Sequence, residues 1–302
     1  MFKEFLKDLI KLRFNYAIGK KTWFGSGGNS LIFLTINTLQ NLIFLIKLCP
    51  KNFQILVFGA GSNVIVRDGG IKGITIKLGN EFRFLKINKN EKTLEIGSSA
   101  KDSEIVKFCE KKGISGFEFL KGIPGTLGGN IRMNAGCYGK EISDSLVSCT
   151  IINRSGKLLV LQKKDIKFGY RSTSISKDSI IINAKFKISF KKNYLIKKYS
   201  EKLSEIRKKT QPYAIRTGGS TFTNPKKKSE AAWKLIDKIG YRGKKLGGAS
   251  VSSKHSNFLI NENVATSLDL ELLGEEIREK IKKKYKINLE WEILRIGKFK
   301  KI

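Results

Sequence analysis

Apolar residues recur along the chain at spacings that predict both strands and helices. The first third reads as short strands around one helix, which spans residues 38–48 and stops before Pro50. Its strands are expected at residues 31–36, 54–58, 64–67 and 74–78. A strand near Thr93, a helix over 102–112 closed by Gly113, and further strands follow. Those further strands are expected at residues 146–153, 157–161 and 180–190. This succession predicts an α+β fold.

The last third begins with a basic linker and a solvated helix over residues 185–209. Thr266 and Asp269 have the spacing of a capping box for a long helix at 267–285. A helix at 231–239 and strands at 257–260 and 289–296 complete this part. At the other end, Phe2, Phe5, Leu6, Leu9 and Ile10 share one face of a predicted helix. That face is expected to pack on its own domain, although a membrane surface is an alternative.

Four parts follow from this reading. They are an N-terminal helix at 1–18, two subdomains at 19–85 and 86–192, and a C-terminal domain at 193–302. No stretch has the roughly 18 uninterrupted apolar residues of a membrane span, and no export signal is expected, so the predicted location is cytoplasmic.

The net charge of +33 comes from lysine: the chain has 48 lysines and only 11 arginines. Codon bias in an A/T-rich genome explains such an excess, because Ile, Asn and Phe are also abundant. A basic nucleic-acid-binding protein is the alternative, although sequence-specific readers favour arginine. One histidine and four cysteines without CxxC spacing exclude the common zinc and dithiol motifs, so no metal site is expected.

Glycine is enriched in two turns. Gly59-Ala60-Gly61-Ser62-Asn63 lies between two predicted strands, which excludes the dinucleotide fingerprint that opens a helix. It predicts either an anion-binding nest of backbone N–H groups or a tight hairpin. The run from Lys121 to Gly139 holds six glycines with apolar residues between them. We interpret it as backbone that closely approaches a large flat ligand and its diphosphate, with a tightly turned core loop as the alternative.

Seven motifs then reveal a resemblance. They are GAGSN…DGG, GIPGTLGGNIRMNAGCYG, FGYR, QPYAIRTGGSTFTNP, AWKLIDKIGYRGKKLGGASVS, HSNFLIN and LEWEILRIG. In this order they are similar to the UDP-N-acetylenolpyruvoylglucosamine reductase (MurB) family, and the compact C-terminal domain resembles the family's shorter, type II-like branch. The similarity runs from about Thr22 to Gly297.

The resemblance implies an FAD-binding fold of the vanillyl-alcohol-oxidase (PCMH) type in two subdomains, with a third α+β domain for substrate. It implies non-covalent FAD, NADPH as reductant, and a UDP-sugar whose enolpyruvyl double bond is reduced during peptidoglycan precursor synthesis. The expected partners are these small molecules, without nucleic acid or membrane insertion, and the expected state is a monomer.

The resemblance also implies three catalytic residues. Arg171 matches the arginine that holds the substrate carboxylate, Ser220 matches the proton donor, and Glu292 matches the acid that polarises the developing enol. From its position alone Ser220 reads as a turn serine, and Glu290 shares the predicted strand face of Glu292. Tyr170, Arg171 and Asn224 match substrate-contacting positions.

The implied FAD contacts are Gly59, Gly61, Ser62, Asn63, Gly122, Ile123, Gly125, Thr126, Gly129, Met133, Asn134 and Gly136. Two positions depart from the family. The turn Gly25-Ser26-Gly27-Gly28-Asn29-Ser30 stands where the family usually has a larger residue, often arginine, before the glycine pair and Pro-Ala after it. Thr223 stands where lysine is common. Besides this reductase, two other functions stay open: an FAD-dependent oxidase of a small molecule, and the nucleic-acid-binding protein.

Overall fold

The computed structural model describes residues 12–225 and 230–300. The chain forms two compact units, each built from several segments. Of the described residues, the first comprises 12–13, 33–60 and 73–207, and the second comprises 14–32, 61–72, 208–225 and 230–300. The face predicted at Phe2–Ile10 lies outside the described residues, and the four-part division stays a prediction.

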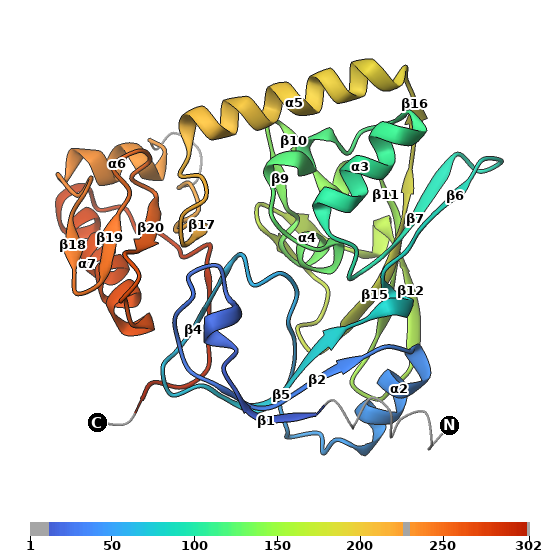
Figure 1. The fold of residues 1–302 in the computed structure, drawn as a ribbon, viewed down its shortest axis with the longest axis horizontal. Helices are drawn as coiled ribbons and strands as arrows, with labels where there is room; N and C mark the ends of the chain where they lie inside the picture. Colours follow the sequence, from blue (N-terminus) through green and yellow to red (C-terminus); the bar gives the residue numbers. More distant parts are fainter. Residues whose placement is uncertain (1–11, 226–229, 301–302) are drawn as a thin grey trace. The chain divides into compact units, whose positions relative to one another are not determined.

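The first unit is centred on a five-stranded sheet in the order β12-β11-β15-β7-β6. Every neighbouring pair is antiparallel. Its strands are β6 (Leu85–Asn88), β7 (Thr93–Gly97), β11 (Leu146–Ile152), β12 (Leu158–Gln162) and β15 (Ile180–Lys187). Helices α3 (Asp102–Lys112) and α4 (Leu127–Met133) pack on this sheet through one apolar core (Figure 1). That core includes Leu94, Ile105, Ile131, Cys149 and Phe186.

The other elements of this unit are short, apart from α2 (Leu39–Leu48) and α5 (Asn193–Thr210), whose last turn passes into the second unit. The short strands are β3 (Ile55–Val57), β8 (Ile114–Ser115), β9 (Gly136–Cys137), β10 (Lys140–Glu141), β13 (Phe168–Gly169), β14 (Ser172–Thr173) and β16 (Ser189–Phe190). The single-turn helices are η2 (Asn80–Phe82), η3 (Glu118–Gly122), η4 (Ile142–Asp144) and η5 (Lys163–Asp165).

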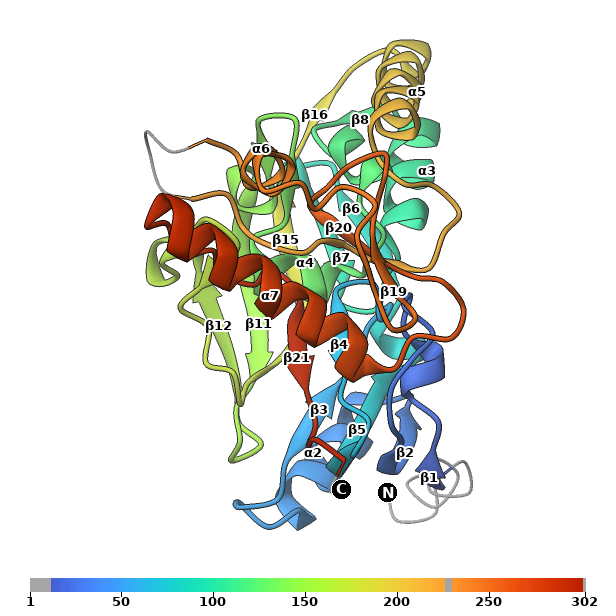
Figure 2. The same ribbon diagram turned by 90° about the vertical axis from the view of Figure 1, so that its left-hand side faces the viewer.

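The second unit contains an antiparallel sheet in the order β17-β20-β19-β18. Its elements are η1 (Gly19–Lys21), β4 (Val64–Val66), β17 (Thr217–Ser220), α6 (Ala232–Lys238), β18 (Lys245–Leu246), β19 (Ala249–Val251), β20 (Phe258–Asn261), α7 (Ser267–Tyr285) and β21 (Leu294–Ile296). Buried side chains of α6 and α7 cover this sheet, and Figure 2 shows α7 running past it. Strand β21 pairs in parallel with β4.

A further sheet, in the order β1-β2-β5-β3, includes residues of both units because their boundaries fall within its strands. Strands β1 (Arg13–Tyr16), β2 (Ser30–Ile36) and β5 (Ile71–Leu78) contribute to it with β3. Arg13–Tyr16 therefore form a strand at the end of the segment for which a helix was expected. Aromatic Phe14 and Tyr16 suit an extended backbone.

Most predicted elements are confirmed within one or two residues. The side chain of Thr266 accepts from the Asp269 N–H, so the capping box of α7 is present, and Gly113 ends α3 with a φ of 69°. The expected strand at 289–296 is wrong in its first half, because only Leu294–Ile296 form a strand. None of the helices in residues 12–225 and 230–300 combines the length and apolarity needed to cross a membrane.

Candidate functional site

Ser220 is the last residue of β17 in the second unit. The pairing of β17 with β20 shifts register between Thr217 and Ser220, and such an irregularity turns side chains away from the regular alternation. Gly219, just before it, has a φ of 84°, and no atom lies within 4 Å of the place where its Cβ would stand. The half-buried Ser220 therefore follows a stretch of backbone with open space beside it.

The segment that carries Glu292 lies directly against the residues after Ser220. The Glu292 N–H donates to the Thr221 carbonyl at 2.9 Å, and the Thr223 N–H donates to the Glu290 carbonyl at 2.9 Å. Two motifs about 70 residues apart in sequence, GGSTF and LEWE, are thus paired through their backbones. Ser220 and Glu292 are both half-buried, and the Glu292 N–H bonds the residue that directly follows Ser220.

Asn63 joins the first glycine turn to this same segment. Its side-chain Nδ2 donates to the Glu292 carbonyl at 3.1 Å, and its own carbonyl accepts from the Leu294 N–H at 3.1 Å. The turn does not form a tight hairpin, because β3 pairs with β5 while β4 pairs with β21. Within the second unit, the motifs of Asn63, Ser220 and Glu292 therefore meet.

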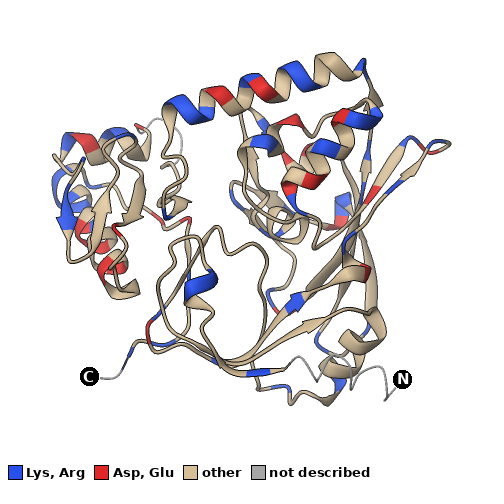
Figure 3. Ribbon diagram, viewed as in Figure 1, with Lys and Arg blue, Asp and Glu red and all other residues tan. Residues whose placement is uncertain are grey.

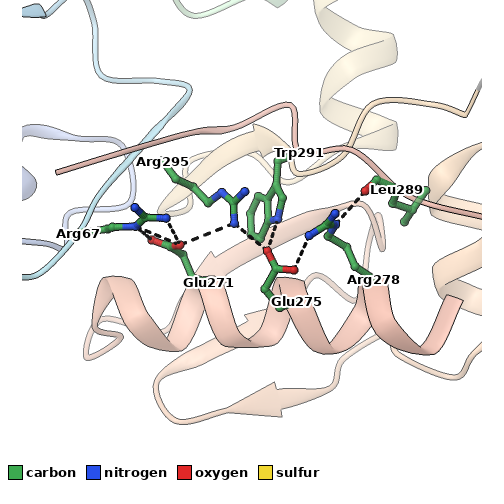
Figure 4. A network of polar contacts seen from close by, with 7 residues as sticks. All are labelled: Arg67, Glu271, Glu275, Arg278, Leu289, Trp291 and Arg295. Carbon is green, nitrogen blue, oxygen red and sulfur yellow. Dashed lines mark hydrogen bonds and ion pairs between the residues drawn. The ribbon is translucent and has the colours of Figure 1, made fainter. Parts of the chain in front are cut away.

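A polar network anchors the Glu292 segment to α7 (Figure 4). The Glu275 Oε1 accepts from Trp291 Nε1 at 2.8 Å and from Arg295 Nη1 at 2.7 Å, while Arg278 Nε donates to the Leu289 carbonyl at 2.8 Å. Although burial acts to raise the pKa of Glu275, donation from Trp291 and Arg278 and the nearby arginines hold it below its ordinary value. One turn earlier on α7, the Glu271 carboxylate accepts hydrogen bonds from Nε and Nη2 of Arg67.

This anchoring distinguishes the two acidic residues that the sequence leaves easily confused. Residues 289–293 do not form a continuous strand, so Glu290 and Glu292 do not share a strand face. Glu290 is exposed, whereas Glu292 is half-buried and has polar partners in the structure. Trp291 between them packs on Phe222, with ring centroids 5.1 Å apart.

Arg171 belongs to the first unit, in the two-residue turn between β13 and β14. Its φ of 54° is unusual for a residue with a side chain. The guanidinium donates to the Gly136 carbonyl at 2.7 Å and lies 4.9 Å from the centre of the exposed Tyr170 ring. Asn134 also holds this turn, because its Nδ2 donates to the Gly169 carbonyl at 3.1 Å. Arg171 is therefore fixed to the end of the long glycine run.

Glycines of the long run serve two purposes. A Cβ on Gly125 would lie 2.8 Å from Asp102 Oδ2, and one on Gly136 would lie 2.4 Å from the Lys140 carbonyl, so the protein's own packing excludes a side chain there. A Cβ on Gly129 would meet only Thr126 Oγ1, at 3.7 Å. The core-loop reading thus explains Gly125 and Gly136, while Gly129 leaves an open backbone face that a ligand can approach.

The buried carboxyl group of Asp102 lies against Gly125 of this run. Asp102 is 1% exposed; its Oδ1 accepts from Asn130 Nδ2 at 2.6 Å, and its Oδ2 has no hydrogen-bond partner among the described residues. Burial raises the pKa of Asp102 to about 8, against a smaller opposing effect of the Asn130 hydrogen bond. The Asp102 N–H donates to the Gly125 carbonyl at 3.2 Å, so the backbone of this residue also holds the glycine run in place.

The remaining predicted residues are distributed over both units. Thr126 lies against Gly59, whose Cβ would stand 2.8 Å from Thr126 Oγ1. Asn224 uses its Oδ1 to accept the Ala232 N–H at the start of α6. Gly61 and Ser62 lie in the expected turn of the second unit. In the first unit Gly122 ends η3 and Met133 ends α4, so the predicted loop is partly helical there, while Ile123 follows η3 directly.

Sequence reasoning missed two arginines that line glycines. Arg207 on α5 has its Cδ 3.4 Å from the position of a Gly122 Cβ, and burial lowers its pKa. Arg216 lies beside Gly25, with Cδ and Nε 3.5 Å from the position of a Cβ there. Each arginine is far in sequence from the glycine that it contacts, so local spacing could not predict either contact. The only signal in the sequence is that arginine, rather than the abundant lysine, stands at these two positions.

Two family models and several known proteins match this chain in sequence. A family model described as an FAD binding domain matches residues 31–162, and one described as the UDP-N-acetylenolpyruvoylglucosamine reductase C-terminal domain matches residues 211–296. UDP-N-acetylenolpyruvoylglucosamine reductase of Rickettsia massiliae is 44% identical over 284 residues, which cover 94% of this chain and 95% of the relative. That of Rickettsia prowazekii is 43% identical, with the same coverage.

A solved structure is also similar. The crystal structure of UDP-N-acetylenolpyruvylglucosamine reductase (MurB) from Thermus caldophilus superposes with a TM-score of 0.81 at 26% identity. The match covers 95% of this chain and 98% of the other. The resemblance seen in the motifs is confirmed across nearly the whole sequence, and this chain belongs to the UDP-N-acetylenolpyruvoylglucosamine reductase (MurB) family.

Proposed function

We propose that this chain reduces the enolpyruvyl double bond of UDP-N-acetylglucosamine enolpyruvate to give UDP-N-acetylmuramate, with FAD as cofactor and NADPH as reductant. Family membership supports the reaction. The observation that carries the assignment of residues is the hydrogen bond between Glu292 N–H and the Thr221 carbonyl, which joins the segments of two catalytic candidates. The protein acts as a cytoplasmic monomer on small molecules, with the four-part division given above.

The described residues fit FAD. In the first unit, Gly129 presents an open backbone face, and the buried Ser98 Oγ, on a residue that lies against Gly128, has no hydrogen-bond partner among the described residues. FAD would be held by the twelve positions that the family resemblance implies, from Gly59 to Gly136. When bound, it supplies hydride transfer from NADPH to the terminal carbon of the substrate double bond.

Arg171 holds the substrate carboxylate. Negative charge develops on the carbon next to the carboxylate when the terminal carbon accepts hydride, and it delocalises into that carboxylate. A guanidinium is always charged and can bind both oxygens. Its contact with the Gly136 carbonyl fixes the Arg171 side chain before substrate arrives. Loss of one such donor typically costs about 2.7–4 kcal/mol of transition-state stabilisation.

Ser220 provides the proton and Glu292 polarises the enol. The Ser220 Oγ–H donates its proton to the carbon that carries the developing charge, and solvent restores the proton afterwards. A hydroxyl is a weak acid, but a carbanion-like centre is a strong base. The backbone bonds of Glu292 to Thr221 and Asn63 keep the Glu292 segment at the end of β17.

The decisive experiment separates the two half-reactions of a Ser220→Ala variant under anaerobic conditions. NADPH should bleach the flavin of this variant at the wild-type rate, while reoxidation by the enolpyruvyl nucleotide slows by about 100-fold or more. Ser253→Ala, at an exposed position of the same unit, is the matched control. Normal reoxidation of Ser220→Ala would exclude Ser220 as the proton donor.

The same experiment distinguishes the alternatives. An oxidase of a small alcohol or amine would not recover its flavin colour with the enolpyruvyl nucleotide. A nucleic-acid-binding protein would not take up FAD, and its affinity for nucleic acid would fall linearly with the logarithm of salt concentration.

A further inference from the structure

A hollow on the second unit is not used by the mechanism above. It measures about 440 Å³, which is room for a phosphate group and an aromatic ring. Its lining is mostly polar and comes from two distant parts of the sequence. The lining residues are Lys20, Thr22, Trp23, Gly25, Arg216 and Asn263.

Both walls of the hollow are fixed by one buried residue. The Asn261 Nδ2 donates to the Phe24 carbonyl at 2.7 Å, and the Asn261 N–H donates to the Arg216 carbonyl at 2.9 Å. Thr22 closes the turn of the first wall, because its Oγ1 donates to the Gly19 carbonyl and accepts from the Gly25 N–H. The backbone of the hollow is therefore held in place without a ligand.

The hollow carries two cations without a counter-charge. Lys20 and Arg216 are exposed, and neither forms an ion pair among the described residues. The acidic residue next to Asn263, Glu262, accepts instead from Ser250 Oγ at 2.6 Å. The guanidinium of Arg216 lies beside Gly25, with Nε and Cζ 3.5 and 3.7 Å from the place where a Cβ of Gly25 would stand.

An indole and the first glycine turn border these cations. The Trp23 side chain is 44% exposed, and the backbone N–H of Trp23 donates to the Gly61 carbonyl at 2.8 Å. The hollow is thus next to the turn of Ser62 and Asn63, for which an anion-binding nest is predicted. Two cations beside an exposed indole suit a ligand with a phosphate and an aromatic base.

We propose that this hollow binds the phosphate and base of a nucleotide, with Lys20 and Arg216 on the phosphate and Trp23 against the base. FAD, NADPH and the UDP-sugar share this chemistry, and contact with the Gly61 turn favours FAD. The inference rests on the nucleotides of the proposed function but not on the catalytic roles of Arg171, Ser220 or Glu292, so Ser220→Ala leaves it untouched.

The test compares K20Q/R216Q with K245Q/K282Q, which removes the same charge from exposed positions elsewhere in the second unit. Three constants are measured: the Kd of the apoprotein for FAD, the NADPH concentration that half-saturates flavin reduction, and the nucleotide concentration that half-saturates reoxidation. We expect one of them to rise at least tenfold in K20Q/R216Q alone, and less so at high salt. The constant that rises identifies the ligand.

A second readout tests the indole. Binding of the same nucleotide should quench tryptophan fluorescence in the wild type, and Trp23→Phe should lose that part of the quenching while Trp233→Phe keeps it. If all three constants of K20Q/R216Q stay within twofold of K245Q/K282Q, the proposal is overturned. The single variant R216Q gives the same comparison if the double variant does not fold.

Discussion

Three asparagines that read as ligand contacts also hold the fold together. Asn63 Nδ2 bonds the Glu292 carbonyl, Asn224 Oδ1 accepts at the start of α6, and Asn134 bonds Glu141 and Gly169. The bonds of Asn63 to Glu292 and of Asn134 to Gly169 join residues 229 and 35 positions apart in sequence, so no local pattern could predict these two. The resemblance names these three asparagines as ligand contacts, and the structure shows which bonds each amide makes within its unit.

The two acidic residues of the LEWE motif give a matched pair of variants. Glu292→Gln should slow flavin reoxidation by the enolpyruvyl nucleotide by roughly 100-fold or more, because a neutral amide polarises the developing enol less. Glu290→Gln changes an exposed side chain two residues away and should stay within twofold of the wild type. Equal losses in both variants would show that the motif acts only through its backbone.

Asp102 predicts an unusual dependence of stability on pH. In the folded chain the pKa of Asp102 is raised to about 8, so its carboxyl group stays protonated below that pH. In the unfolded chain the same carboxyl group has a pKa of 3.8. The folded state therefore binds more protons across this interval, and this residue makes the free energy of unfolding fall as pH rises from about 4 to 8.

The Asp102→Asn variant should remove that slope, which is up to about 1.4 kcal/mol per pH unit, and should be more stable than the wild type at pH 8. Urea unfolding at pH 5, 6.5 and 8 measures it, with exposed Asp178→Asn as control. If the free energy of unfolding of Asp102→Asn still falls with pH as steeply as that of the wild type, Asp102 does not cause the slope and is ionised in the folded protein.

At the scale of elements, regular patterns were predictable and irregular ones were not. Helices α3 and α7 have clear caps at Gly113 and Thr266, and the alternation of β15 marks a buried strand. Helix α4 was missed because Gly128 and Gly129 conceal its helical spacing. The residues before β21 looked like a strand, but bonds to α7 and to Thr221 hold them in an irregular path.

The network on α7 predicts that stability and catalysis are coupled. Glu275→Gln removes the charge that holds Arg295 and Arg278, and should lower the free energy of unfolding by about 1–3 kcal/mol. Because Glu292 lies between Trp291 and Arg295 in the sequence, flavin reoxidation should slow as well, while reduction by NADPH stays normal.

Glu279→Gln, one turn further along α7 and exposed, is the control. If Glu275→Gln loses stability but reoxidises at the wild-type rate, the network supports the fold alone.

At the scale of the whole molecule, charge is spread rather than gathered. Figure 3 shows lysine and arginine on helices and strands of both units, with acidic residues among them on α5 and α7. This distribution is what codon bias would produce, and screening at physiological salt limits its reach to about 8 Å. The motifs, rather than the charge of +33, therefore carried the prediction of function.

The most direct test of the account is an anaerobic titration of the purified wild-type chain. We predict a yellow protein that loses its flavin colour with one equivalent of NADPH and recovers it with one equivalent of UDP-N-acetylglucosamine enolpyruvate, releasing UDP-N-acetylmuramate. A colourless protein that takes up no FAD, or a reduced flavin that this nucleotide leaves bleached, would contradict it.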